Sequence, residues 1–212
     1  MVNRYCAITD IQSYLDITID TVNYPKQSLV EDWITASEND IDSFTDRKFD
    51  AGTETEFFSP QVASYVLWLK RTPITSITSI SENTGTDFVP VWTALTSGVD
   101  YITESNDLGL VRTKVPYYGT KKLKADYVGG SATISLDVKE LCVAMVKKRY
   151  YESILGISSL DTELVSISSI RVSEKSNDAI KFSVVQLDKE IADKLRKLSG
   201  ASKSQMFGIG VY

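Results

Sequence analysis

The segment YVGGSATISLDVKELCVAMVKKRYY, residues 127–151, decides how this chain is divided, because a strand-like ending runs through two glycines towards a long helix. Glycine pairs ahead of a helix can cradle a phosphate group. Here Gly129 and Gly130 lack the Lys-Ser/Thr of a P-loop, and they lie well before Asp137, the residue that can cap the helix. We therefore predict a flexible exit from the last strand of a β-rich region, and no nucleotide site.

The helix that follows is expected from about Asp137 to Leu155. Its apolar residues surround much of the circumference, which predicts deep burial or packing on two sides; they are Val138, Leu141, Cys142, Val143, Met145, Val146 and Tyr150. Three basic residues suit the negative end of the helix dipole. The same three form a candidate basic interface patch: Lys147, Lys148 and Arg149.

Residues 53–130 have the composition of a β-rich insertion. Turn signals such as Ser59-Pro60 and Thr72-Pro73 separate short runs rich in Val, Ile, Thr and aromatic residues. The runs are TETEFFS, SYVLWLK, ITSITSI, FVPVW, GLVRT and KKLKADYV. We expect a small antiparallel β subdomain inserted between helices.

Residues 1–52 are expected to hold two N-terminal helices, the second from Ser28 to about Arg47. At 100° per residue its apolar face would comprise Leu29, Val30, Trp33, Ile34, Ser37, Ile41 and Phe44. The acidic residues opposite this face are most simply solvated. In the alternative interpretation they face a channel; these candidates are Glu31, Asp32, Glu38, Asp42 and Asp46.

Residues 131–199 would complete the helical core with an extended, Ser-rich arm over 156–183 and a last helix over about 185–198. The tail, residues 200–212, combines glycines with apolar side chains and is expected to become ordered by docking onto another surface. Its candidate docking residues are Met206, Phe207, Ile209, Val211 and Tyr212. The predicted fold class is α+β: a core of long antiparallel helices, an inserted small antiparallel β subdomain and an extended C-terminal arm.

Composition limits the chemistry that the chain could perform. It has 212 residues, 42% of them hydrophobic, a net charge of −5 and no histidine, so Ser-His-Asp triads and His-ligated metals are excluded. Two cysteines are too few for a disulfide framework or a zinc site, and Cys142 is expected to be a small core residue. No run is long and apolar enough for a membrane span. We expect no enzyme, no catalytic, metal-binding or cofactor-binding residues, and no cofactor.

Five stretches, in this order, resemble the head-tail connector (adaptor) proteins of tailed bacteriophages. They are YCAITDIQSYLDI, LVEDWITASENDIDSFTDRKFD, LWLKRTPITSITSI, LKADYVGGSATISLDVKELCVAMVKKRYY and GISSLDTELVSISSIRVS. Within these stretches the matching positions are the run from Ala36 through Ile41-Asp42 to Arg47 and Phe49, then Arg71, Pro73 and Ile74, and the pattern Tyr127-x-x-Gly130. The chain departs from the family in having Ser135-Leu136 where many members have a proline before the third helix.

The resemblance implies a virion structural protein of the phage neck, made in the host cytoplasm. It implies a homo-oligomeric, twelvefold ring that binds beneath the portal protein, extends the DNA channel and receives the next neck or tail component, a stopper or tail-completion protein. Double-stranded DNA would pass through without sequence-specific binding, and no membrane would be involved. Two alternatives stay open: another neck, tail-completion or baseplate protein, and a carbohydrate-binding β module in which Trp68 and Trp92 stack on sugars.

Overall fold

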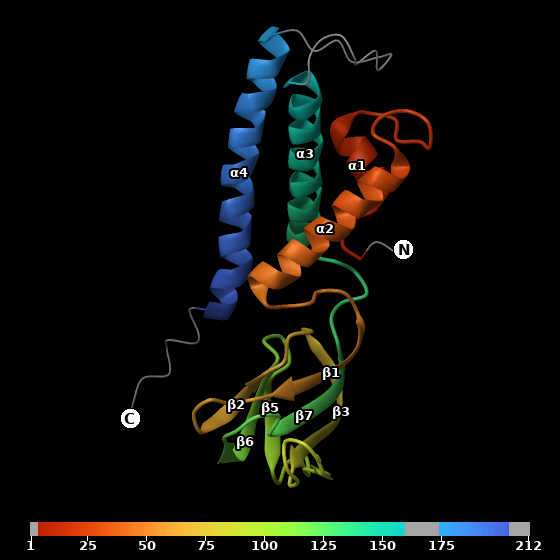
Figure 1. The fold of residues 1–212 in the computed structure, drawn as a ribbon. Helices are drawn as coiled ribbons and strands as arrows, with labels where there is room; N and C mark the ends of the chain where they lie inside the picture. The colour runs from red at the N-terminus through yellow and green to blue at the C-terminus, as the bar shows by residue number, and fades with distance from the viewer. Residues whose placement is uncertain (1–3, 160–173, 204–212) are drawn as a thin grey trace. The chain divides into compact units, whose positions relative to one another are not determined.

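A computed structural model describes residues 4–159 and 174–203 of the chain (Figure 1). The chain divides into two compact units. The helical unit combines residues 1–45 with residues 135–212, and the β unit comprises residues 46–134. Among the described residues, no helix combines the length and the apolar character needed to cross a bilayer.

The helical unit contains α1 (Ile8–Leu15), α2 (Gln27–Thr45), α3 (Leu136–Ser159) and α4 (Glu174–Lys203). Helix α3 is the centre of this unit, because α1, α2 and α4 all pack against it (Figure 1). This arrangement explains why α3 is apolar around so much of its circumference. Its most deeply buried residues are Val138, Leu141, Cys142, Val143 and Val146.

The buried face of α2 differs from the face predicted from its apolar residues. Residues spaced three or four apart are buried, namely Val30, Ile34, Ser37, Glu38, Ile41 and Thr45. Phe44 is instead exposed, and Trp33 is only half-buried. The buried face therefore includes a glutamate, which requires compensation by polar partners.

The predicted core of long antiparallel helices with a small inserted β subdomain and an extended C-terminal arm is wrong. The chain is α+β, but α1 has 8 residues and α2 has 19. Seven strands in two antiparallel sheets make the β content substantial. The expected arm is partly helical, since α3 continues to Ser159 and α4 begins at Glu174; residues 160–173 of the arm lie outside the described residues.

The polar composition of the arm misled the prediction. Ser, Asn and Asp favour loops because their side chains compete for backbone hydrogen bonds. In α4 the Ser183 hydroxyl donates to the carbonyl oxygen of Ala179, at 2.9 Å, one turn earlier. A serine satisfied in this way is compatible with a helix.

The β unit contains β1 (Gly52–Phe58), β2 (Ser64–Trp68), β3 (Ile74–Asn83), β4 (Trp92–Ala94), β5 (Tyr101–Ser105), β6 (Leu110–Tyr117) and β7 (Leu123–Gly129). One sheet has the strand order β1-β7-β3-β4 and the other has the order β2-β6-β5. Both sheets contribute to one hydrophobic core. Strand β7 alternates strictly between buried and half-buried residues, as a strand with one face on a core should.

The glycine pair at the end of β7 is a tightly packed joint and not a flexible exit. Gly130 N donates to the Pro73 carbonyl at 2.9 Å, and Ser131 N donates to the Phe49 carbonyl at 2.9 Å. Gly130 has φ +79°, and a Cβ atom there would lie 1.9 Å from the carbonyl oxygen of Asp50. A Cβ atom at Gly129 would lie 2.2 Å from the carbonyl oxygen of Arg71. Only glycine permits this close approach of three backbone segments.

Replacing Gly130 with alanine should therefore destabilise the β unit. A left-handed backbone costs a non-glycine residue about 1–2 kcal/mol, and relief of the clash with Asp50 should cost a further ~1–3 kcal/mol. Gly98→Ala is the matched control, because Gly98 has φ +78° but no atom within 4 Å of the added Cβ. Urea unfolding should show a larger loss for Gly130→Ala; equal losses would contradict the packing argument.

Candidate assembly site

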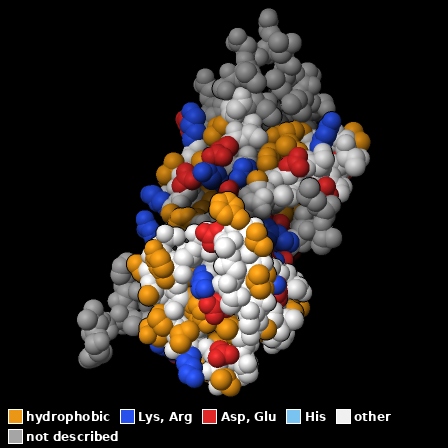
Figure 2. Space-filling view, turned by 60° about the horizontal axis from the view of Figure 1, so that its bottom comes forward, with side chains coloured by type: hydrophobic (Ala, Val, Ile, Leu, Met, Phe, Trp, Pro, Cys, Tyr) orange, Lys and Arg blue, Asp and Glu red, His pale blue; other side chains and the backbone are white. Residues whose placement is uncertain are grey.

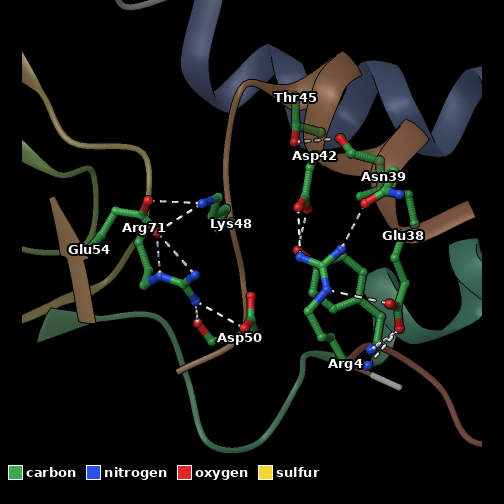
Figure 3. Close-up of polar contacts among 11 residues, drawn as sticks. Arg4, Glu38, Asn39, Asp42, Thr45, Lys48, Asp50, Glu54 and Arg71 are labelled. Atoms are coloured by element: carbon green, nitrogen blue, oxygen red, sulfur yellow. Dashed lines mark hydrogen bonds and ion pairs between the residues drawn. The ribbon is translucent and has the colours of Figure 1, made fainter. Parts of the chain in front are cut away.

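Arg71 lies between β2 and β3 and is the central cation of the β unit (Figure 3). Its side chain is 10% exposed; Nη1 lies 3.0 Å from Asp50 Oδ2, and Nη2 lies 3.1 Å from Glu54 Oε2. Lys48 Nζ donates to both oxygens of the Glu54 carboxylate, at 2.9 Å to Oε1 and 2.8 Å to Oε2. Burial acts to raise the pKa of Glu54, but the hydrogen bonds from Lys48 and Arg71 outweigh it and hold the pKa below its usual value.

A second, more deeply buried chain of hydrogen bonds lies beside this cluster. Arg71 N donates to the Tyr127 hydroxyl oxygen at 2.8 Å, and the Tyr127 hydroxyl donates to Glu56 Oε1. Lys70 N donates to the same Glu56 oxygen at 2.9 Å. Burial raises the pKa of Glu56, and the hydrogen bonds from Tyr127 and Lys70 offset this only in part.

Several residues that carry the family resemblance converge on this place, whereas Ala36, Ile41 and Asp42 lie on α2 of the helical unit. Arg47 Nε donates to Thr72 Oγ1 at 3.1 Å, and its guanidinium carbon lies 5.7 Å from the centre of the Phe49 ring. Pro73 accepts the Gly130 hydrogen bond described above. Positions scattered over about eighty residues thus surround the point where the chain enters and leaves the β unit. We name this group the Arg71 cluster: Arg47, Lys48, Phe49, Asp50, Glu54, Arg71, Pro73, Tyr127 and Gly130.

In the helical unit, Arg4 organises a comparable group on α2 (Figure 3). Its side chain lies 2.7 Å from Asp42 Oδ2 and 3.4 Å from Glu38 Oε2. The other Glu38 oxygen accepts the backbone N–H groups of Arg4, at 2.6 Å, and Tyr5, at 2.8 Å. The Tyr5 hydroxyl also contacts Asp42. These bonds fasten the N-terminal segment to α2.

The five candidate acidic residues do not form one open face. Glu38 is 3% exposed, and Arg4 engages both Glu38 and Asp42. Asp46 belongs to the β unit and pairs with Lys70 at 2.5 Å. Asp32 is exposed, while Glu31 is half-buried and accepts a hydrogen bond from Gln27 at 2.9 Å.

The three candidate basic residues are largely engaged within the helical unit. Arg149 lies 2.7 Å from Asp40 of α2, and Lys148 lies 2.6 Å from Asp188 of α4. Lys147 Nζ lies 5.7 Å from the centre of the Tyr151 ring. The Arg149 and Lys148 ion pairs tie α3 to α2 and α4. The candidate docking residues of the tail, Met206, Phe207, Ile209, Val211 and Tyr212, lie outside the described residues.

The sequence interpretation missed several of these groups. It identified neither Arg4 as the partner of Glu38 nor the Tyr127–Glu56 bond, because both join residues more than thirty positions apart. Within the described residues, no group of three or more Cys, Asp and Glu side chains is placed to hold a metal ion. Trp68 and Trp92 are half-buried, and the Trp92 ring lies 5.7 Å from that of Phe57.

Comparison with known proteins gave matches among solved structures only. No family model and no curated protein matches the chain. The fold is similar to a chain from the neck of a native gene transfer agent particle, computed with C12 symmetry, at 12% identity and a TM-score of 0.48, covering 86% of this chain and 94% of that one. A chain from the virion of the native particle gives 14% identity and a TM-score of 0.49, covering 68% and 76%.

A third similar chain comes from the neck of an empty gene transfer agent particle, computed with C6 symmetry. Its identity is 14% and its TM-score is 0.45, with coverage of 59% of this chain and 67% of that one.

Removing the Glu38 carboxylate should release the N-terminal segment. Glu38→Ala takes away the acceptor of two backbone N–H groups and a partner of Arg4, so we expect a loss of roughly 2–5 kcal/mol. Asp32→Ala, an exposed position on the same helix, should change the unfolding free energy by less than about 0.5 kcal/mol. Denaturant unfolding and amide hydrogen exchange at residues 4–6 measure both effects; unchanged exchange in Glu38→Ala would contradict the anchoring role.

Glu56 should make the β unit less stable as pH rises. Because its folded-state pKa is raised, the folded chain holds this proton more tightly than the unfolded chain does. The contribution of Glu56 to the free energy of unfolding is fully present below pH 4.5, the ordinary pKa of a glutamate. It is lost as pH rises through the raised pKa of the folded state. Glu56→Gln keeps an acceptor oxygen and should abolish this loss.

Urea unfolding from about pH 4 to about pH 8 should therefore show wild type losing stability relative to Glu56→Gln as pH increases. Asp87→Asn, an exposed carboxylate of the same unit, controls for the substitution itself. A difference between wild type and Glu56→Gln that stays constant with pH would refute the assignment.

Proposed function

We propose that this chain is a virion structural protein, a head-tail connector (adaptor) subunit in the neck of a tailed phage-like particle. The observation that carries the proposal is the Arg71 cluster. Six residues of the family resemblance are far apart in sequence yet meet where the chain enters and leaves the β unit: Arg47, Phe49, Arg71, Pro73, Tyr127 and Gly130.

We further propose that the chain acts by assembly and not by catalysis. The buried and half-buried carboxylates of both units are matched by arginine, lysine, tyrosine or backbone donors, as structural carboxylates are. With Glu38 and Asp42 engaged by Arg4, the acidic residues of α2 available to face a DNA channel are Glu31 and Asp32. Together with the net charge of −5, they would favour passage of DNA without adhesion.

Exposed apolar side chains supply candidate interfaces on each unit. On α4, Phe182 and Val185 are exposed and stand one turn apart. In the β unit, the loop between β3 and β4 holds Phe88 at 96% exposure, with Val89 also exposed beside it. Figure 2 shows hydrophobic side chains at several separate places on the described surface. Two different apolar surfaces on one chain suit heterologous contacts, which give a ring when the rotation between successive subunits closes.

The β3–β4 loop is well built for such a contact. Asn83 Oδ1 accepts hydrogen bonds from Gly85 N at 2.9 Å and Val91 N at 3.1 Å. Thr86 Oγ1 accepts one from Val89 N at 3.1 Å. A loop fixed by its own hydrogen bonds loses little conformational entropy when Phe88 enters a partner.

The subunits would form a twelvefold ring under the portal protein, with a stopper or tail-completion protein below it. The tail residues would dock on the portal or on a neighbouring subunit. The test is to mix the purified chain with the portal of the same particle and examine the mixture by electron microscopy and size-exclusion chromatography. We expect rings, alone or on the portal. A chain that stays monomeric with the portal present would refute the proposal.

Substitution of the α4 surface should separate assembly from folding. The double variant Phe182→Ser/Val185→Ser should keep its circular dichroism spectrum and weaken ring formation by roughly tenfold or more. Gln186→Ser, a polar exposed position on the same helix, is the matched control and should assemble normally. Normal assembly of the double variant would exclude this surface as an interface.

A further inference from the structure

The two cysteines of the chain lie side by side in the helical unit. Cys6 Sγ lies 3.1 Å from Cys142 Sγ, although the residues are 136 positions apart in the sequence. Both are buried, with Cys6 5% exposed and Cys142 fully covered. Both are free thiols in the structure.

The backbone on each side of the pair is held in place. The N–H groups of Arg4 and Tyr5 donate to Glu38, and Ala7 N donates to Asp10 Oδ2 at 2.8 Å, so Cys6 is fixed from both directions. Cys142 lies within α3 between buried residues. A disulfide bond is about 2.05 Å long, so the two sulfur atoms need to approach by only about 1 Å.

We propose that Cys6 and Cys142 are a redox pair: two thiols under reducing conditions, and an intramolecular disulfide that fastens the N-terminal segment to α3 under oxidising conditions. The oxidant is a small hydroperoxide, because a bulky disulfide reagent has no access to buried sulfur. The inference concerns the isolated chain and does not depend on the proposed ring.

The reaction balances in two steps. Cys6, the more accessible thiol, attacks hydrogen peroxide; the O–O bond breaks, Cys6 becomes a sulfenic acid and water leaves. The Cys142 sulfur then attacks the Cys6 sulfur, the S–OH bond breaks, and the hydroxyl leaves as water with the Cys142 proton. Both thiols are oxidised to one disulfide, and one peroxide is reduced to two waters.

The environment makes this reaction slow. The contact with Cys6, followed by burial, raises the pKa of the Cys142 thiol well above its usual value, so its reactive thiolate is scarce. The pair should therefore stay reduced during brief exposure and oxidise over long exposure. Dithiothreitol reverses the change by thiol–disulfide exchange once the chain is unfolded, because exchange requires access to the sulfur atoms.

The experiment uses the full chain, treated with hydrogen peroxide, then denatured and blocked with a thiol reagent. We expect a mass loss of two hydrogen atoms, no remaining free thiol, and a cross-link between the tryptic peptides 5–26 and 140–147. Closing so long a loop should raise the melting temperature by about 5–15 °C, and reduction of the unfolded chain followed by refolding should remove the gain.

The single variants Cys6→Ala and Cys142→Ala are the controls, and neither should cross-link or gain thermal stability with peroxide. Should either variant fail to fold, the peptide map of the wild-type chain still decides. Any one of three results would overturn the proposal: two blocked thiols after prolonged oxidation, sulfinic acid without a cross-link, or a disulfide between two chains.

Discussion

The β unit depends on one buried cation. The Arg71 guanidinium is almost fully covered, and a buried charge is tolerated only when opposite charges and hydrogen bonds compensate for lost hydration. Asp50 comes from the incoming segment and Glu54 from β1, while the Arg71 backbone binds Tyr127 of β7. One residue thereby fixes three segments, and the glycine pair can pack closely because those segments are already held.

The sequence was informative about local structure and uninformative about which distant residues contact one another. Periodicity located α2 and α3 within a few residues, and the alternation of apolar residues with turn signals indicated an antiparallel β region. The same patterns placed Phe44 in the core and Glu38 at the surface, and the structure reverses both. The pattern could not reveal the reason, because the partner of Glu38 is Arg4, which lies before α1.

The candidate sites also combine patterns that the sequence shows with long-range contacts that it does not. A charge run such as Lys147, Lys148 and Arg149 could be read in the sequence, but its partners Asp40 and Asp188 come from other helices. The thiol contact between Cys6 and Cys142 carries no sequence signal beyond the presence of two cysteines. Periodicity did not point to Arg71 or Tyr127, because their contacts join residues that are far apart in the sequence.

The glycine joint has a consequence for the origin of the chain. Phe49 and Ser131 are hydrogen-bonded neighbours, so the β unit begins and ends at nearly the same point in space. A module with adjacent ends can be lost, gained or exchanged by recombination without changing the path of the chain in the helical unit. Chains that carry the same helical unit with a different insert, or with a short turn in its place, are thus within one genetic event of this one.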